Sequence, residues 1–254
     1  MKMTFLGTGA AFTVGAKNFQ SNVLIENDSN KKMLLDCGSD IRHSLWEQSK
    51  SYHDISDVYI THLHADHMGG LEWLGFSNKF DPDCGKPLLH ISELLVDDLW
   101  SKCLSGTMES LEGEISQLSS YFDVNSIKEN HTFVWENIEF HLIQTVHIMN
   151  GFILSPCFGL FFKGPHGNKV YYTADTQFCP QLLGHFYDDA DVIFQDCETT
   201  HRPSGVHAHY DELITLPEEI KQKMWLYHYN HGHLPDAKAA GFKGFVVKGQ
   251  VFEF

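Results

Sequence analysis

The first part of the chain alternates short apolar runs with polar turns. Two apolar runs flank a glycine-rich turn and a third follows closely, which predicts an antiparallel start to a sheet. Helical spacing is present over residues 39–48 and again from residue 70. The predicted strands of this part are residues 3–6, 22–25, 32–36 and 58–61.

The rest of the chain repeats this order, with strands first and helices afterwards. Residues 87–91 have a strand pattern, and Ser92 opens a capped helix that we expect to reach residue 103. Residues 164–168 predict a hairpin turn, and residues 210–222 have helical character that Pro217 interrupts. The remaining predicted strands are residues 132–135, 138–143, 158–162, 169–173, 192–195, 224–227, 244–247 and 250–254.

No stretch of the sequence divides the chain into parts. It has no linker, no low-complexity tract and no repeat with a period of about 20 to 50 residues. With 43% hydrophobic and 20% charged residues over 254 positions, the chain has ample material for a core and is not a disordered sequence. We therefore expect residues 1–254 to form a single domain of the α/β (α+β) class.

Composition limits the cellular locations and the classes of binding partner that we expect for this protein. No apolar run approaches the roughly 20 residues that a bilayer crossing needs, and the first residues lack the features of a signal peptide, which predicts a cytoplasmic protein. The six cysteines are scattered without a Cys-x-x-Cys pair, so we expect free thiols rather than disulfides or a zinc ribbon. The net charge of -15 argues against an extended nucleic-acid interface.

Metal-binding side chains concentrate directly after the predicted strand 58–61. Alternate residues at a strand end project to one side, and the next two follow as the chain bends into a helix, so four side chains are expected to share one cleft. Imidazole and carboxylate ligands without a thiolate are typical of catalytic zinc sites, and they suit manganese and iron as well. The glycines at 69 and 70 are expected to let the helix backbone lie close beneath the bound ions. The four side chains are His62, His64, Asp66 and His67.

This motif, together with residues 4–9 and the strand end at residues 34–38, resembles the metallo-β-lactamase superfamily over essentially the whole chain. The resemblance implies a four-layer αββα sandwich, with two mixed sheets flanked by helices and a dinuclear metal site at one edge. It also implies three ligands that local spacing does not indicate. The first is His147, in preference to His141, and the second is Asp175. The third is a histidine near the end of the chain, for which His228 is preferred to His231 or His233. The implied metal ligands are His62, His64 and His147 for one ion, Asp66, His67 and His228 for the other, and Asp175 for both.

The chemistry implied by this resemblance is hydrolysis. Two divalent ions, most simply zinc with manganese or iron as alternatives, would share a bridging hydroxide and stabilise charge on a phosphoryl or carbonyl oxygen. Asp66 would hold the nucleophile as well as a metal, and Asp36 would orient imidazoles by accepting their second ring proton.

Residues 193–199 and 205–210 resemble a narrower branch, which contains tRNase Z and related phosphodiesterases. There an acid after a strand pairs with a histidine of the next loop, which implies these roles for Asp196 and His207. The histidine would contact a phosphate oxygen and protonate the leaving group, and His209 is the alternative proton donor.

The chain departs from tRNase Z at the position of the basic arm that grips tRNA. Residues 164–168 are only a tight turn, which together with the net charge argues against tRNA as substrate. We therefore expect a small phosphodiester, such as a cyclic nucleotide or a phospholipid head group. No membrane partner is expected, and a homodimer is one expectation because many family members pair. Four aromatic residues belong either to the pocket or to the core: Trp73, Phe152, Phe178 and Tyr229.

Two other functions stay open at this stage. The same metals could act on a lactone, a thioester or a β-lactam. Alternatively, the chain could be a metal-loaded binding or sensing protein, with residues 104–130 as a lid that blocks the site. A panel of chromogenic esters separates the first alternative from a phosphodiesterase, and a ligand that stays bound without hydrolysis would favour the second.

Overall fold

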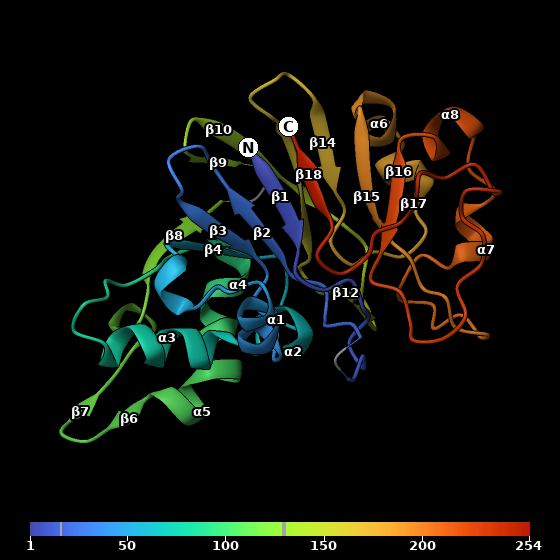
Figure 1. Cartoon of the computed structure of the whole chain (residues 1–254). Coiled ribbons are helices and arrows are strands. Elements are labelled where there is room, and N and C mark those ends of the chain that lie inside the picture. Colours follow the sequence, from blue (N-terminus) through green and yellow to red (C-terminus); the bar gives the residue numbers. More distant parts are fainter. Residues whose placement is uncertain (16, 129–130) are drawn as a thin grey trace.

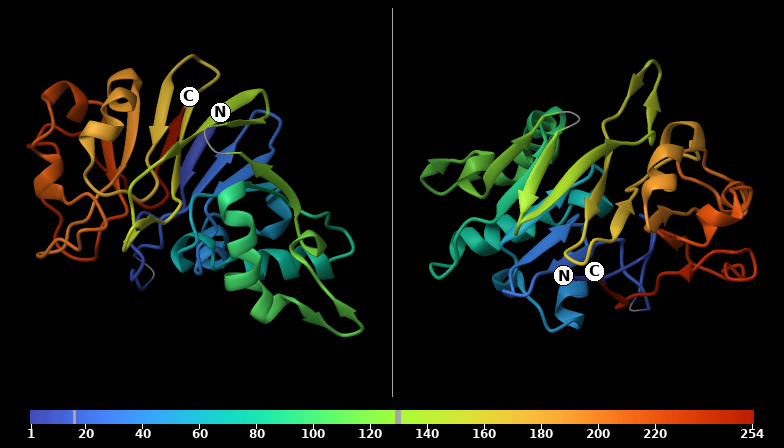
Figure 2. Two further views of the ribbon diagram at one scale, coloured as in Figure 1. Left: turned by 180° about the vertical axis from the view of Figure 1, so that it is seen from behind. Right: turned by 90° about the horizontal axis from the view of Figure 1, so that it is seen from above.

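The fold is a sandwich of two sheets. A computed structural model describes residues 1–15, 17–128 and 131–254. Two seven-stranded sheets face each other, and helices cover their outer sides (Figures 1 and 2). This arrangement confirms the predicted α+β class and the two mixed sheets flanked by helices.

The first sheet contains the amino-terminal strands and closes with the last strand of the chain. Its first four strands in spatial order are antiparallel to one another, which includes the three strands of the predicted antiparallel start. The fourth strand pairs in parallel with the fifth, and the later pairs are parallel as well. The two chain ends lie side by side (Figure 1), and the amino group of Met1 donates a hydrogen bond to the carbonyl of Phe254 at 3.1 Å. The spatial order is β18 (Val251–Glu253), β1 (Lys2–Phe5), β2 (Val23–Glu26), β3 (Lys32–Leu35), β4 (Asp57–Ile60), β5 (Leu88–Ser92) and β8 (Asp123–Ile127).

The second sheet repeats the same plan. An antiparallel half is followed by parallel strands, and residues 164–168 form the expected hairpin turn, with the amide of Gly164 bonded to the carbonyl of Asn168 at 2.9 Å. The spatial order is β17 (Gly244–Phe245), β16 (Met224–Tyr227), β15 (Val192–Asp196), β14 (Lys169–Tyr172), β13 (Phe158–Lys163), β10 (Ile138–Gln144) and β9 (Thr132–Trp135).

Helices connect the strands and cover the sheets. The Ser92 hydroxyl caps the helix predicted to start there, and the helix continues beyond α4 as a π-helix to Leu104. Pro217 divides the predicted helix 210–222 into two short helices. Helix α6 is absent from the sequence-based prediction. The helices are α1 (Ile41–Glu47), α2 (Ala65–Met68), α3 (Leu71–Phe80), α4 (Glu93–Asp98), η2 (Leu99–Leu104), α5 (Ser105–Met108), α6 (Pro180–Asp189), α7 (Tyr210–Leu213) and α8 (Glu218–Lys221), with 3-10 turns η1 (Tyr52–Asp54) and η3 (Leu118–Ser120).

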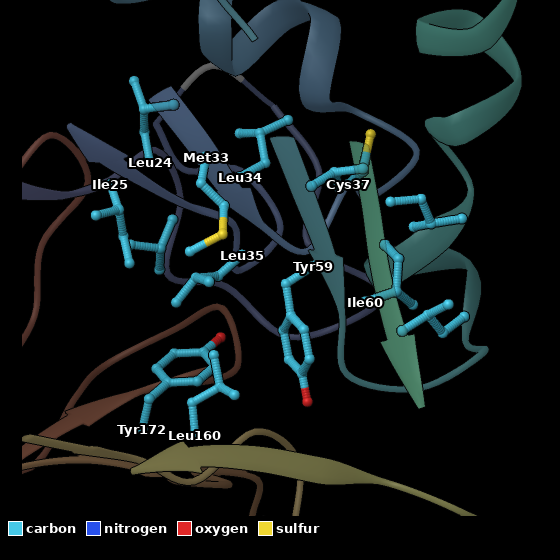
Figure 3. Close-up of a cluster of buried hydrophobic side chains, with 14 of the residues drawn as sticks. Leu24, Ile25, Met33, Leu34, Leu35, Cys37, Tyr59, Ile60, Leu160 and Tyr172 are labelled. Carbon is cyan, nitrogen blue, oxygen red and sulfur yellow. The ribbon is translucent and has the colours of Figure 1, made fainter. Parts of the chain in front are cut away.

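The two sheets share a hydrophobic core. Alternate residues of a strand point to opposite faces, so Leu35 and Tyr59 of the first sheet face Leu160 and Tyr172 of the second (Figure 3). All four are buried, and burial of each such side chain stabilises the fold by about 1.5–3 kcal/mol. The Tyr59 hydroxyl also donates a hydrogen bond to the carbonyl of Phe158 at 3.0 Å, which joins the sheets directly.

The hypothesis of a lid at residues 104–130 is wrong for the described part of that segment, which excludes residues 129–130. Residues 123–127 form β8, which pairs in parallel with β5. Tyr121 and Phe122 are buried, and the Tyr121 hydroxyl donates a hydrogen bond to the carbonyl of Met108 at 2.5 Å. The polar hairpin of β6 (Ser110–Leu111) and β7 (Glu114–Ile115) projects from this packed segment. The segment is therefore an integral part of the first sheet and its helical layer.

None of the helices in the described ranges combines the length and the apolar character that a membrane crossing requires.

Candidate metal centre

Side chains from both sheets meet at one edge of the sandwich. The histidine motif follows β4 of the first sheet, with Asp66 and His67 in the short helix α2. Strands β10, β14 and β16 of the second sheet end shortly before His147, Asp175 and His228. The seven side chains expected as ligands therefore lie together, in two groups that share Asp175.

The first group contains three imidazoles and the shared carboxylate. His64 Nδ1 lies 3.0 Å from His62 Nε2 and 3.1 Å from His147 Nε2. Oδ2 of Asp175 lies 3.7 Å from Nε2 of both His62 and His147. Atoms bound to one zinc ion at about 2.0–2.2 Å are about 3–4 Å apart, so this group has the spacing of a metal site.

The second group contains two carboxylates and two imidazoles. Oδ2 of Asp66 lies 3.1 Å from His67 Nε2 and 3.2 Å from His228 Nε2. Asp175 lies 3.3 Å from the same nitrogen of His67 and 3.6 Å from that of His228. All four side chains are buried, whereas His64 of the first group is exposed.

Hydrogen bonds behind the imidazoles fix which ring nitrogen faces the cluster. His147 Nδ1 donates to the carbonyl of Val206 at 2.8 Å, and His67 Nδ1 lies 2.7 Å from Asp36 Oδ2. His62 Nδ1 lies 3.0 Å from the hydroxyl of Thr61, which itself donates to Asp36. On His62 and His147 the ring proton lies on Nδ1, so their Nε2 lone pairs face the cluster and a cation fits there, and the Nδ1 bond of His67 likewise turns its Nε2 toward the cluster.

The charges of the two groups also fit a cation. Burial and the neighbouring imidazole of His67 hold the pKa of His62 well below its usual value, and burial lowers the pKa of His147, so both rings are neutral as metal binding requires. Against the effect of burial, the nearby carboxylate of Asp175 raises the pKa of His228 to about 10. Among the residues that the structure describes, buried His67 Nε2 and Asp175 Oδ1 have no hydrogen-bond partner. The carboxylates of the second group also raise the pKa of His67, so they favour positive charge between them, and a divalent ion would take the place of the imidazole protons.

Three residues at the edge of the site have a left-handed backbone although none is a glycine. Asp36 (φ 65°) follows β3, Ala174 (φ 54°) precedes Asp175, and His228 (φ 61°) follows β16. Such conformations cost about 1–3 kcal/mol each and persist where the surrounding structure fixes them, often at functional sites. Asp36 and His228 contact His67 and Asp66 of the cluster from these positions, and the turn at Ala174 directly precedes Asp175.

Glycines hold α2 close to the loop after β3. The amide of Gly70 bonds to the carbonyl of Cys37 at 2.8 Å, and a Cβ atom on Gly70 would lie 2.4 Å from the carbonyl oxygen of Gly38. A Cβ atom on Gly38 would lie 2.1 Å from the carbonyl oxygen of Asp66. The close approach expected for residues 69 and 70 is thus made to the neighbouring loop, and it positions the helix that carries Asp66.

Gly38→Ala is expected to lower the free energy of unfolding by about 1–3 kcal/mol, because the methyl group must displace backbone rather than a flexible side chain. Denaturant unfolding of the variant and the wild type measures this difference. Gly85→Ala is the matched control, since a Cβ atom there meets no atom of the described residues within 4 Å. Equal stability of the Gly38 and Gly85 variants would contradict this description of the loop.

A third group lies beside the second. His207 Nδ1 bonds to Asp196 Oδ2 at 2.8 Å and lies 3.8 Å from Asp175 Oδ2, while Asp196 Oδ1 lies 3.3 Å from His228 Nδ1. Burial opposes protonation, but the carboxylate of Asp196 raises the pKa of His207. The alternative, His209, uses both ring nitrogens for backbone contacts, one to the carbonyl of Thr200 and one to an amide of α7. The pairing expected for Asp196 and His207 is present.

The other candidate residues lie apart from the three groups. The imidazole of His141 is half exposed on β10 beside Glu139, and His231 and His233 are exposed. Of the four aromatic residues, Phe152 is fully exposed on the hairpin of β11 (Met149–Asn150) and β12 (Ile153–Leu154), and the others are partly buried. None of these residues belongs to a metal-binding group in the part of the chain that the structure describes.

Glu198 is a residue whose role the sequence did not indicate. Its buried carboxylate accepts hydrogen bonds from the Thr200 hydroxyl at 2.6 Å and from the amide and hydroxyl of Ser204 at 2.8 and 2.9 Å. These bonds order the loop that carries His207 and the Val206 carbonyl. A signal was present, since an acid so close to an apolar strand is rarely buried without a specific role.

Glu198→Ala is expected to lower kcat/KM for a hydrolysed substrate by about 10- to 100-fold, as for other residues that orient metal ligands from behind. Without the three hydrogen bonds to Glu198 the loop is no longer held in place. His207 and the Val206 carbonyl, which accepts the hydrogen bond from His147, then lose their fixed positions. Steady-state kinetics measure the loss, and the exposed Glu219→Ala in α8 is the control. An unchanged kcat/KM for the Glu198 variant would show that the loop needs no such support.

Comparison with known proteins gives the fold and the family. The chain aligns with the metallo-β-lactamase fold protein YhfI of Bacillus subtilis with a TM-score of 0.76 and 17% identity, covering 99% of both chains. It aligns with human tRNase Z, short form, with a TM-score of 0.71 and 18% identity, covering 100% of this chain and 99% of the other. At this identity the likeness establishes the fold, which is the metallo-β-lactamase fold that the sequence resemblance implied.

The sequence comparisons are more specific. Two relatives named Anti-Pycsar protein Apyc1 are each 34% identical to this chain over 90% of its length: one from Paenibacillus harenae, of which 90% is covered, and one from Bacillus phage vB_BveM-Goe7, of which 88% is covered. The family model described as Anti-Pycsar protein Apyc1 matches residues 1–252. The chain belongs to the Anti-Pycsar protein Apyc1 family.

Proposed function

We propose that this chain is a metal-dependent phosphodiesterase with a dinuclear centre, and that its substrate is a small phosphodiester such as a cyclic nucleotide. The observation that carries the proposal is the position of Asp175. Its Oδ2 atom lies 3.3–3.8 Å from imidazole nitrogens of His67, of His62 and His147, and of His207. One carboxylate thus joins two candidate metal sites to a candidate proton donor.

The seven converging side chains would hold two divalent ions. Zinc is the first choice for neutral imidazole and carboxylate ligands, with manganese and iron as alternatives. What the bound ions supply is positive charge for the phosphoryl oxygens and an acidified water. Since Asp66 Oδ2 is engaged by His67 and His228, its other oxygen would accept a hydrogen bond from the attacking water.

His207 would complete the reaction on the leaving-group side. Its Nδ1 atom is held by Asp196, so Nε2 is the atom that carries a transferable proton. The imidazole is 18% exposed and can therefore reach a bound substrate. As the bond between phosphorus and the leaving oxygen breaks, Nε2 would give its proton to that oxygen, and Asp196 would stabilise the protonated ring beforehand.

The charge of the chain and its relatives favour a small substrate. A net charge of -15 repels a long polyanion, and only a tight turn at residues 164–168 stands where tRNase Z has a basic arm. The relatives carry the name Anti-Pycsar protein Apyc1. An activity directed against Pycsar is compatible with the hydrolysis of a cyclic nucleotide by this chain.

A substrate panel tests the proposal. The purified protein, prepared with and without zinc or manganese, is assayed with bis(p-nitrophenyl) phosphate, purine and pyrimidine cyclic nucleotides, a lactone and a thioester. We expect metal-dependent hydrolysis of the phosphodiesters, with at least one cyclic nucleotide preferred to the nitrophenyl ester. If only the lactone or the thioester is hydrolysed, the chain is a hydrolase of carbonyl compounds and the phosphodiesterase proposal is wrong. A cyclic nucleotide that binds tightly and stays intact would replace it by a binding protein.

A further inference from the structure

A second set of metal-binding side chains lies away from the centre described above. His53 belongs to the 3-10 turn η1, and Asp81 and Cys84 belong to the turn that follows α3. One ligand atom of each of these three residues lies within 4.8 Å of the others. We call these three residues the Cys84 cluster.

The Cys84 cluster is separate from the candidate metal centre. Turn η1 precedes β4, whereas the histidine motif follows it, so the two sites lie at opposite ends of this strand (Figure 1). Helix α3 starts near the motif and runs for 10 residues, about 15 Å, to Phe80. No residue is common to the two sites.

Contacts hold the three ligand groups in place. His53 Nδ1 lies 3.2 Å from Cys84 Sγ, and His53 Nε2 lies 3.3 Å from Asp81 Oδ2. The Tyr52 hydroxyl donates to the same carboxylate oxygen at 2.9 Å, and the other oxygen accepts the amide of Asp83 at 3.0 Å. The turn is closed by the amide of Cys84, which bonds to the carbonyl of Asp81 at 3.1 Å. These bonds orient the carboxylate and the thiol toward one imidazole.

We propose that the Cys84 cluster binds a transition metal ion of the zinc class, with His53, Asp81 and Cys84 as ligands and water in the remaining position. Ligand atoms around one zinc ion are about 3.6 Å apart, and one ligand atom of each residue lies within 4.8 Å of the others, so a small movement of the exposed His53 ring would bring all three to one ion. Binding replaces the thiol proton of Cys84, which leaves to the solvent, and forms the metal–sulfur bond. The thiolate selects zinc or cobalt over magnesium and manganese. The proposal does not depend on the function assigned to the other centre.

The residues around the Cys84 cluster favour binding of a cation, and the cluster is accessible from the solvent. The carboxylates of Asp81 and Asp83 belong to the same turn as the Cys84 thiol, and the amide of Asp83 bonds to Asp81, so the site has acidic side chains on one side. The His53 side chain is 53% exposed, and its ring stacks on Tyr52 with a centroid distance of 4.2 Å. A bound ion would join η1 to the turn after α3.

Cobalt spectroscopy of the full-length protein tests the site. Bonding of a thiolate to Co(II) gives a near-ultraviolet charge-transfer band, and the candidate metal centre contains no cysteine among its seven residues. Protein produced in minimal medium with cobalt as the added transition metal is compared with two variants, Cys84→Ser and Cys103→Ser. Cys103 is an exposed thiol in η2 and belongs to no metal-binding group in the described ranges, so its variant is the matched control.

We expect the band in the wild type and in Cys103→Ser, its loss in Cys84→Ser, and its loss from the wild type when zinc is added. His53→Ala should weaken cobalt binding by at least about tenfold. Absence of the band in the wild type, or its persistence in Cys84→Ser, would overturn the proposal and leave a hydrogen-bonded surface cluster. Hydrolysis of the substrate panel is expected to be the same in both serine variants, so a failure here is distinguishable from a failure of the proposed function.

Discussion

Asp175→Asn is expected to lower kcat/KM for a phosphodiester by about a thousandfold or more. The amide keeps the size of the side chain but removes the charge that both candidate metal sites share. Stabilisation of the transition state by bound metals amounts to several kcal/mol, and each 1.36 kcal/mol corresponds to a factor of ten in rate. Steady-state kinetics and elemental analysis, applied to the same preparation, measure the rate and the metal content per chain.

The matched control is His141→Asn. This imidazole lies on β10, which precedes His147, but it is half exposed, lies 3.5 Å from Glu139, and belongs to no metal-binding group in the described residues. Its replacement should change neither kcat/KM nor metal content. If Asp175→Asn keeps its metals and stays within about tenfold of the wild-type rate, the shared carboxylate is not part of the reaction, and the dinuclear proposal must be abandoned.

His207→Ala is expected to affect substrates according to their leaving group. A proton donor contributes about 10²- to 10⁴-fold to rate, and it matters when the leaving oxygen is a strong base. A cyclic nucleotide, which leaves as an alkoxide, should therefore lose at least about a hundredfold in kcat. Nitrophenolate leaves without a proton, so bis(p-nitrophenyl) phosphate should lose less than about tenfold.

His201→Ala separates this effect from a general disturbance of the loop. His201 is exposed in the same loop as His207, and its variant should resemble the wild type on both substrates. Equal losses on the two substrates in His207→Ala would mean that the imidazole positions the substrate and donates no proton. The assignment of His207 and Asp196 as a donor pair would then fail, while the metal ligands would be unaffected.

The sequence predicted the part of the site that is local in the chain. His62 and His64 are two residues apart at a strand end, and this spacing alone places them on one side of the strand. The positions of His147 and Asp175 depend on which strand ends meet across the sandwich, which local spacing does not encode. The resemblance to a family supplied those positions, and the structure brings them next to the local motif.

The elements that were missed have weak local patterns. β8 has the sequence Asp-Val-Asn-Ser-Ile, in which only Ile127 is buried, and it lies at the edge of its sheet. Helix α6 contains Gly184 and two aromatic residues, which lower helix propensity, although Pro180 at its first turn is a typical start. Glu198 was missed because its partners lie in a loop whose path cannot be inferred from periodicity. In each case tertiary contacts, and not the local sequence, determine the structure.

The division of the candidate ligands between the two sheets has a consequence for assembly of the protein. The first sheet contributes the four residues of the histidine motif, and the second contributes His147, Asp175 and His228. Neither half can hold an ion with its full ligand set, so the ions would bind only the assembled sandwich. By mass action, their binding would shift the equilibrium between unfolded and folded chain toward the folded state. Newly made chains in a metal-starved cell would accumulate with their halves less firmly joined, and the supply of metal would limit how much mature protein forms.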